Sequence, residues 1–320
     1  MPNIVISGCG NIGSRLLQSV SNIQNADIGT LDIYGVDPFQ RSLDLSTERF
    51  HQENKGGHTL HMSTNTADLP AEANLLIVSV DAANRLAALT SVLEHCKPKA
   101  IILEKILFNK FEEFDTVQTI LDDLGIPCWV NCSRNIWPGY QQLKQTLGGQ
   151  NVTSYTVSGS DWNMGSNAIH FMAALEYVAG EPITGLSMES SRAVTRESKR
   201  AGYKEVTGTL IGTTASGGQV SLSSLPEEGI AISLQLSTAD ETYTIAEGKT
   251  IVRGNDTSTE TAFPMLYTSQ LTQPLVQILK DGQSDLPTYA DSVRQHHLLF
   301  GALNEVFYGA GNSEAQCPVT

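Results

Sequence analysis

The stretch Asn3-Ile4-Val5-Ile6-Ser7-Gly8-Cys9-Gly10-Asn11-Ile12-Gly13 decides the expected fold. Its first five residues form a short apolar run, which is typical of a buried strand in a parallel sheet. The glycines that follow match the pattern G-x-G-x-x-G, and residues 11–20 then carry apolar side chains at helical spacing. A strand, a glycine turn and a helix in this order predict a dinucleotide-binding unit.

Each glycine of this turn has its own expected task. Gly8 permits the tight turn, Gly10 lets the backbone approach a pyrophosphate, and Gly13 brings the helix close to the strand. The N–H groups at the start of the helix, together with the positive end of its dipole, would then face the phosphates. We therefore expect the cofactor to contact Gly8, Cys9, Gly10, Asn11, Ile12 and Gly13.

Asp37 ends the second predicted strand, residues 31–37. A carboxylate at this position accepts hydrogen bonds from the adenosine ribose hydroxyls, and it repels the 2′-phosphate of NADP. Arg41 follows four residues later and could face that phosphate. The sequence therefore favours NAD as the cofactor, with NADP as the alternative.

The alternation of strand and helix continues to about residue 130 and then changes. It predicts an α/β fold whose first domain, residues 1–130, is a doubly wound parallel sheet. Beyond residue 150 the strand candidates alternate apolar and polar residues, as in 229–237, which is typical of an antiparallel sheet with one buried face. The second domain, residues 131–320, is thus expected to hold a large, mostly antiparallel open sheet of about five or six strands, with closing helices. The remaining strand candidates are 73–80, 100–103, 126–130, 152–158, 185–191, 206–214, 219–224 and 242–252, and the helix candidates are 110–124, 264–280 and 290–307.

Composition excludes several classes of partner. The chain of 320 residues has 20 Lys and Arg against 34 Asp and Glu, which gives a formal charge of −14. This negative charge disfavours general electrostatic binding to nucleic acid or anionic membranes. Neither a transmembrane run nor a signal peptide is evident, and five scattered cysteines fit reduced thiols. We therefore expect a cytoplasmic protein. Cys128 and Cys132 lack the neighbouring ligands of a zinc site, so no metal is expected.

Four motifs, in order and spacing, resemble the Gfo/Idh/MocA family of oxidoreductases, which includes glucose-fructose oxidoreductase and inositol dehydrogenase. They are the glycine turn, Ser79-Val80-Asp81-Ala82-Ala83-Asn84, Glu104-Lys105-Ile106 and the segment 159–170. The resemblance covers almost the whole chain. It implies an N-terminal Rossmann domain, a C-terminal domain whose open sheet often mediates dimerisation, and hydride transfer between a nicotinamide cofactor and a sugar or polyol. It adds Ser79, Val80, Asp81, Asn84 and Glu104 to the expected cofactor contacts.

The resemblance implies that Lys105 reaches the substrate oxygen near the nicotinamide. An ammonium there can stabilise negative charge on oxygen as hydride leaves carbon. The family has a proline after this lysine, and this chain has Ile106. Because a cis bond before a residue other than proline costs about 2.5–4 kcal/mol, we expect a differently built loop here. The alternative for Lys105 is an ordinary surface lysine at a strand end.

The same resemblance implies that His170 is the acid/base residue. Imidazole, with an ordinary pKa of about 6.5, can take and return a proton near neutrality. Many relatives carry an aspartate one helical turn earlier, where this chain has Ser166. A hydroxyl brings no charge, so the pair is weakened or its role passes to Asn167 or Asp161. The alternative for His170 is a structural histidine.

Further polar and aromatic residues are candidates for holding the substrate. Basic residues gather between 192 and 204, which suits a phosphate or carboxylate and so an acidic or nucleotide-linked sugar; the alternative is a solvated loop. These basic residues are Arg192, Arg196, Lys199, Arg200 and Lys204. The expected substrate contacts are Lys105, Arg134, Trp137, Tyr140, Trp162, Asn163, Ser166, Asn167 and His170.

Together these features favour an NAD(P)-dependent oxidoreductase that acts on a sugar or sugar derivative. Two alternatives stay open: a cofactor-binding sensor or regulator without dehydrogenase activity, and a sugar-modifying enzyme that uses NAD only transiently. The expected partner is a small molecule, with neither nucleic acid nor membrane. We expect a homodimer or homotetramer formed through the Ser/Thr-rich outer face of the second sheet.

Overall fold

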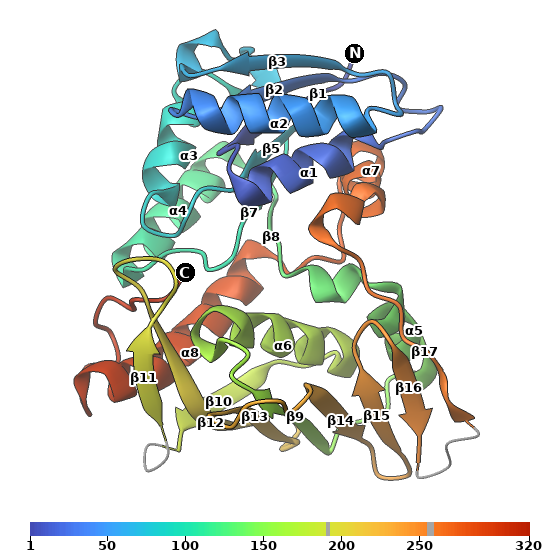
Figure 1. Ribbon diagram of the computed structural model, residues 1–320, viewed down its shortest axis with the longest axis vertical. Coiled ribbons are helices and arrows are strands. Elements are labelled where there is room, and N and C mark those ends of the chain that lie inside the picture. The colour runs from blue at the N-terminus through green and yellow to red at the C-terminus, as the bar shows by residue number, and fades with distance from the viewer. Residues whose placement is uncertain (190–192, 255–258) are drawn as a thin grey trace. The chain divides into compact units, whose positions relative to one another are not determined.

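The computed structural model describes residues 1–189, 193–254 and 259–320. The chain divides into two compact units (Figure 1). The first comprises Met1–Phe108, Glu112–Ser133 and Leu266–Ala290, and the second comprises Asn109–Phe111, Arg134–Met265 and Asp291–Thr320.

The first unit is built on a six-stranded parallel sheet in the order β3-β2-β1-β5-β7-β8. Its central strands are apolar on both faces because helices cover both, and all four residues of β5 are fully buried. The strands are β1 (Asn3–Ser7), β2 (Asp32–Val36), β3 (Thr59–Ser63), β5 (Leu75–Val78), β7 (Ile101–Leu103) and β8 (Cys128–Val130), with a small pair β4 (Glu72–Ala73) and β6 (Lys97–Pro98) beside them. The helices are α1 (Asn11–Ser21), α2 (Gln40–Glu53), α3 (Arg85–Leu93) and α4 (Phe111–Leu124).

The strand order of this sheet reverses between β1 and β5. The chain runs outward from β1 through α1 and α2 to β3, and then returns past β1 to β5. Right-handed crossovers in opposite directions place α1 and α2 on one face of the sheet and α3 and α4 on the other. The ends of β1 and β5 are therefore neighbours at the edge where ligands of such sheets bind, and the amide of Ser79 donates to the carbonyl of Ser7 at 2.8 Å.

The second unit is built on a nine-stranded, mostly antiparallel sheet in the order β10-β12-β13-β9-β14-β15-β16-β17, with β11 paired to β12. One face is buried, with Leu210, Leu222 and Leu234 fully inaccessible, and α6 lies across the sheet (Figure 1). The strands are β9 (Ser154–Ser160), β10 (Ile183–Met188), β11 (Val194–Glu197), β12 (Lys204–Thr214), β13 (Gln219–Leu225), β14 (Ser233–Ser237), β15 (Thr242–Ala246), β16 (Thr250–Arg253) and β17 (Thr261–Ala262). The helices are α5 (Pro138–Leu147), α6 (Met164–Ala179) and α8 (Tyr289–Tyr308).

Both sheets agree with the fold class expected from the sequence. The second sheet has nine strands where about five or six were expected, the strand expected over 229–237 begins only at Ser233, and two further local expectations are corrected. The single strand expected over 242–252 is a hairpin of β15 and β16, because Gly248 turns the chain with φ +73°. The helix expected from residue 264 begins only at Thr272. Within the described residues, no helix is long and apolar enough to cross a membrane.

The segment 266–290 returns to the first unit, although periodicity along the chain placed it in the second. Its helix α7 (Thr272–Asp281) follows a short 3-10 turn, and both pack on α1. The hydroxyl of Thr272 donates to the carbonyl of Ser19 at 2.8 Å, and Leu275 of α7 is buried. An apolar stripe predicts a helix, but it does not reveal which core the helix joins.

Replacing Leu275 by alanine should therefore destabilise the first unit rather than the second. We expect a loss of about 2–5 kcal/mol in the free energy of unfolding, as is usual when a large buried side chain is removed. Hydrogen exchange should rise in α1 before it rises in β12 and β13. The exposed Lys280→Ala on the same helix is the control, since it breaks only a surface ion pair with Asp27. Equal loosening of both units would contradict this assignment.

Candidate active site

The glycine turn after β1 is closely packed at two of its glycines and open at the third. A Cβ on Gly13 would lie 1.8 Å from the carbonyl oxygen of Gly8, and a Cβ on Gly8, where φ is +87°, would lie 2.7 Å from Val80. A Cβ on Gly10 would meet no atom within 4 Å. Gly8 and Gly13 thus bring strand and helix together, while space lies in front of Gly10, as a phosphate cradle requires.

The start of α1 beside this turn suits a negatively charged group. No described side chain caps the helix, and its first turn holds no acidic residue. Asn11 and Ile12 are exposed there. Because the first N–H groups of a helix lack intrahelical acceptors and carry the positive end of its dipole, this end can hold a pyrophosphate.

Asp37 is fixed at the end of β2 by two backbone donors. Its Oδ2 accepts from the amide of Cys9 at 2.8 Å and its Oδ1 from the amide of Phe39 at 2.9 Å. Each carboxylate oxygen can accept a further bond, so the group can still receive ribose hydroxyls. Burial, and then the charge of Asp37, raise the pKa of Cys9 to about 12, so that thiol stays neutral. Arg41 is exposed in the first turn of α2.

The loop after β5 contacts the glycine turn directly. Ser79 donates its hydroxyl to the carbonyl of Gly8 at 2.6 Å, and Val80 packs against Gly8. Asp81 accepts from the amide and side chain of Asn84, which closes the loop before α3. Of the four residues predicted as cofactor contacts in this loop, Ser79 and Val80 touch the turn directly, and Asp81 and Asn84 bind each other just beyond them.

Arg85, the first residue of α3, joins this loop to the one that carries Lys105. Its side chain is almost completely buried, and its guanidinium donates to the carbonyl of Val80 at 2.6 Å and to the carbonyls of Ile106 and Leu107. A planar fork of five donors suits such a set of carbonyls. The side chain of Arg85 thus holds the backbone after Lys105 to the loop that follows β5.

Lys105 is half-buried at the end of β7. The peptide bond between Lys105 and Ile106 is cis, contrary to the difference in loop structure expected from the missing proline. Before it, Glu104 is buried and accepts from the side-chain amide of Asn131. Burial raises the pKa of Glu104, against the opposing effects of Asn131, Lys105 and Arg85.

His170 lies half-buried on α6 in the second unit, one turn after Ser166. The hydroxyl of Ser166 donates to Oε1 of Glu205 at 2.6 Å. The residues considered as substitutes for the missing aspartate are engaged elsewhere: Asn167 donates to the carbonyl of Trp162, and Asp161 pairs with Arg196. Glu205 is therefore the carboxylate that Ser166 contacts.

Arg196 and Asp161 form a two-pronged ion pair beside the start of α6. The guanidinium reaches the two carboxylate oxygens at 2.7 and 2.9 Å and the side-chain oxygen of Asn163 at 2.6 Å. The hydrogen bond from Arg196 lowers the pKa of Asp161. Trp162 is buried and donates its indole N–H to the carbonyl of Ser223. This arrangement fixes the chain where it enters the helix that carries His170.

Three of the expected substrate contacts, Arg134, Trp137 and Tyr140, lie in one mostly buried network. Arg134 binds Glu247 through Nε and Nη2 at 2.6 and 2.8 Å, and Tyr140, which is fully buried, donates to the same carboxylate at 2.6 Å. The guanidinium also lies over the rings of Trp137 and Phe171. These contacts join α5 to the turn between β15 and β16, so their geometry favours a structural role.

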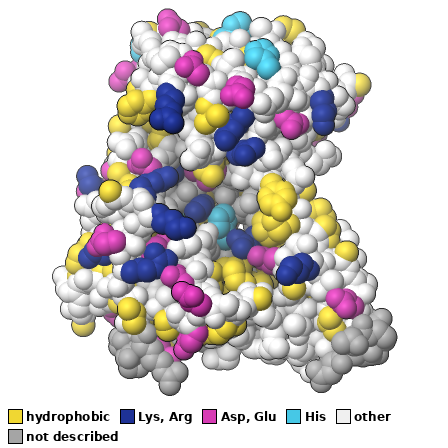
Figure 2. Space-filling view, viewed as in Figure 1, with side chains coloured by type: hydrophobic (Ala, Val, Ile, Leu, Met, Phe, Trp, Pro, Cys, Tyr) yellow, Lys and Arg dark blue, Asp and Glu magenta, His cyan; other side chains and the backbone are white. Residues whose placement is uncertain are grey.

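The basic cluster of the sequence is partly neutralised. Arg192 lies outside the described residues, Arg196 is paired as above, and Arg200 donates to the hydroxyl of Thr320 at 2.9 Å. Lys204 lies near the ring of Phe307, and Lys199 is exposed. Figure 2 shows Lys and Arg mixed with Asp and Glu over the described surface that it presents.

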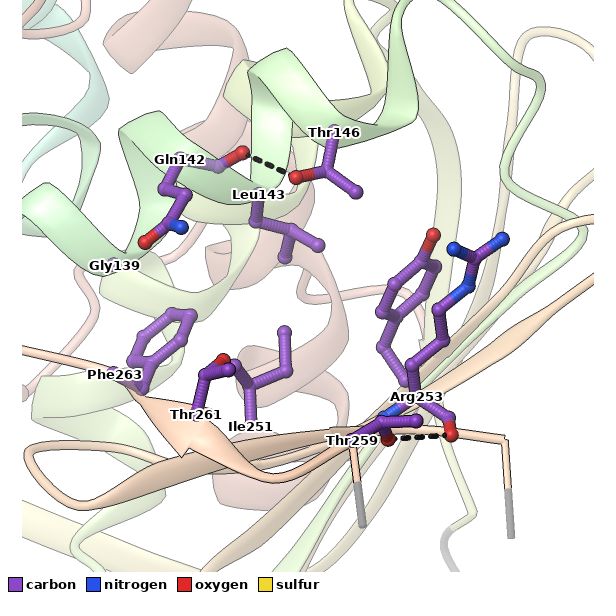
Figure 3. A pocket seen from close by; sticks show the side chains of 10 residues that line it. Gly139, Gln142, Leu143, Thr146, Ile251, Arg253, Thr259, Thr261 and Phe263 are labelled. Carbon is purple, nitrogen blue, oxygen red and sulfur yellow. Dashed lines mark hydrogen bonds between the residues drawn. The ribbon is translucent and has the colours of Figure 1, made fainter. Parts of the chain in front are cut away.

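A separate pocket of about 260 Å³ lies in the second unit between α5 and the strands β15 to β17 (Figure 3). Phe263 and Leu143 supply its apolar wall, and its charged residue, Arg253, is paired with Glu241. None of the site residues expected from the sequence lines it. Among the described residues, no cluster of three or more His, Cys, Asp or Glu is arranged to hold a metal ion.

Sequence reasoning missed Arg85 and Glu205. Arg85 shares a buried helix face with Leu89 and Val92, and a charge in such an apolar stripe was a usable signal. Glu205 is the second residue of β12 and shows no such signal, because its partner Ser166 lies far away in the sequence.

No known family model and no curated protein matches the sequence. Solved structures do match over nearly the whole chain. An oxidoreductase from Agrobacterium radiobacter in complex with NAD+, L-tartaric acid and magnesium has a TM-score of 0.72 at 13% identity, covering 96% of this chain and 97% of that one. Scyllo-inositol dehydrogenase from Lactobacillus casei, with bound NAD(H) and scyllo-inositol, has a TM-score of 0.67 at 13% identity, covering 96% of both chains. UDP-N-acetylglucosamine 3-dehydrogenase from Acidithiobacillus ferrooxidans has a TM-score of 0.68 at 14% identity, covering 96% and 97%. The chain has the fold of these dehydrogenases, and the two-sheet architecture implied by the resemblance is confirmed.

Proposed function

We propose that this protein is an NAD(P)-dependent oxidoreductase, with NAD preferred, that moves a hydride between the cofactor and a sugar or sugar derivative. The glycine turn carries the proposal: it has space in front of Gly10, an uncapped helix start behind it, and the fixed carboxylate of Asp37 beside it. Solved structures with the same fold include an oxidoreductase and dehydrogenases, and three of these structures hold NAD or NAD(H).

The residues of the first unit fit a dinucleotide. The backbone at Gly10 and the start of α1 would hold the pyrophosphate, and Asp37 would hold the ribose hydroxyls. When bound, the nicotinamide supplies a hydride acceptor or donor. Lys105, on the loop held by Arg85, would stabilise negative charge on the substrate oxygen.

His170 would take the hydroxyl proton of an alcohol substrate, or return it in the reverse direction. A sugar or polyol is the proposed substrate class, in line with the inositol and nucleotide-sugar substrates named for the fold neighbours. The pairing of Arg196 with Asp161 reduces the free positive charge near this helix, which weakens the argument for an acidic sugar.

The outer face of the second sheet is proposed to pair with a second copy of the chain. Hydroxyl side chains line it, with Thr209 and Ser223 in contact across β12 and β13, and Ile211 is 44% exposed among them. These outward side chains carry no charge, so a second copy would cover them without burying an unpaired ion.

Replacing Asp37 by alanine should weaken NAD binding and lessen discrimination against NADP. The loss of hydrogen bonds to a charged group, worth about 1.5–3 kcal/mol, corresponds to a rise of roughly 10- to 100-fold in the Kd for NAD. Calorimetric titration with both cofactors measures it. Asp44→Ala, an exposed position on α2, is the control. Retained preference for NAD would remove Asp37 from the cofactor site.

Lys105→Ala and His170→Ala should each lower kcat by about 100-fold or more on the true substrate while cofactor Kd changes little, because each group is proposed to act in the chemical step and not in cofactor binding. Activity would be screened on inositols, aldoses and nucleotide sugars. Lys99→Ala and His95→Ala, both exposed, are the controls. Unchanged cellular function in the double variant of Lys105 and His170 would instead favour a sensor.

Ile211→Asp should convert the proposed oligomer to a monomer, since a charge would be buried at the contact. Light scattering after size exclusion measures the mass of both proteins. A monomeric mass for the unaltered chain would refute the proposed interface.

A further inference from the structure

Glu205, which is buried, and Ser166, which is half-buried, form a hydrogen-bonded pair on the side of α6 that carries His170. Glu205, on β12, is 3% exposed, and the hydroxyl of Ser166 donates to its Oε1 at 2.6 Å. Residues one turn apart on a helix share a face, so Ser166 and His170 point the same way from α6. The carboxylate is thereby tied to the helix at the turn preceding the imidazole.

The packing around Glu205 leaves it little freedom to move. A Cβ on Gly165 would lie 2.9 Å from its Oε2 and 2.9 Å from Val319, so the absence of a side chain at Gly165 lets the carboxylate approach the helix. Burial raises the pKa of Glu205, whereas the hydrogen bond from Ser166 and the charge of Arg196 lower it.

The charges facing Glu205 come from two further elements. Arg196 lies opposite Glu205 in the register between β11 and β12, and its guanidinium is held in two-pronged contact by Asp161. Since those two charges largely cancel, the carboxylate of Glu205 adds negative charge at this end of α6 whenever it is ionised. His170 is the titratable group on the same helix face.

We propose that Glu205, tied to α6 through Ser166, is a positioning residue that raises the proton affinity of the His170 imidazole. The inference rests on the proposed function insofar as His170 serves as acid/base there. Glu205 exchanges no proton in the reaction: the proton of the substrate hydroxyl goes to the imidazole, and the nearby negative charge stabilises the imidazolium that results.

Titration of His170 by NMR in the free protein tests the charge effect without any need for activity. Histidine-labelled protein gives the ring signals, and the His170 signal is assigned by its loss in His170→Gln. In Glu205→Gln we expect the pKa of His170 to fall by about 1 unit, since a neighbouring anion is removed. Ser166→Ala should also lower the pKa of His170, by a smaller amount. This variant provides the test if Glu205→Gln does not fold.

Two further variants separate this effect from a merely structural one. Adding Ser166→Asp to Glu205→Gln returns a carboxylate to the same helix face and should restore the higher pKa. Glu181→Gln is the matched control, because Glu181 accepts from the hydroxyl of Ser216 at 2.7 Å in a similar pair at the other end of α6; it should leave His170 unchanged. An unmoved titration in folded Glu205→Gln, or failure of the added aspartate to restore it, would overturn the proposal.

Kinetics distinguish failure of this inference from failure of the proposed function. With a substrate found, the acid limb of kcat/KM in Glu205→Gln should move to lower pH by about the same 1 unit, because the weaker base loses its proton sooner. A shifted NMR titration without dehydrogenase activity on any sugar would retain the role of Glu205 and reject the oxidoreductase. Dehydrogenase activity together with an unchanged acid limb and an unchanged titration of His170 would retain the oxidoreductase and reject the role of Glu205.

Discussion

The first unit depends on a contact between two backbones. The helix α1 can begin directly behind β1 only because Gly13 presents no side chain to the carbonyl of Gly8, where a Cβ would lie 1.8 Å away. The hydroxyl of Ser79, which directly follows β5, donates a hydrogen bond to the same carbonyl. This close approach directs the start of α1 toward the edge of the sheet where β1 and β5 end, and Asp37 reaches the turn through the amide of Cys9. A ligand that needs N–H donors and a carboxylate together finds both there.

Local periodicity was sufficient to predict the architecture. Apolar runs predicted β1, β2, β5, β7 and β8, and the alternation of apolar and polar residues predicted the buried face of the second sheet. Both patterns are visible because burial selects residues in each strand separately. The strand β3 was not expected, since three of its five residues are half-buried and two are exposed, so its side chains show little apolar bias. The return of α7 to α1 was also not predictable, because it depends on contacts between residues more than 250 positions apart.

The candidate site was predictable where a single segment defines it and obscure where distant segments meet. The glycine turn and Asp37 are read from one βαβ unit, whereas Glu205 meets Ser166 across 39 positions and Glu247 meets Arg134 across 113. No pattern in a single sequence links such pairs. Arg134 illustrates the consequence, since a cation near aromatic residues resembles a sugar site in sequence yet is paired with a buried carboxylate in the structure.

Arg85 is a buried cation that binds backbone carbonyls. Arg134 donates to the carboxylate of Glu247, whereas Arg85 donates to the carbonyls of Val80, Ile106 and Leu107. Burying a guanidinium costs free energy that an apolar side chain would not cost, so stability alone does not account for it. What the arginine provides is a fixed spacing between two loops that end neighbouring strands. Since one loop touches the glycine turn and the other carries Lys105, that spacing determines where the ammonium stands relative to whatever the turn holds.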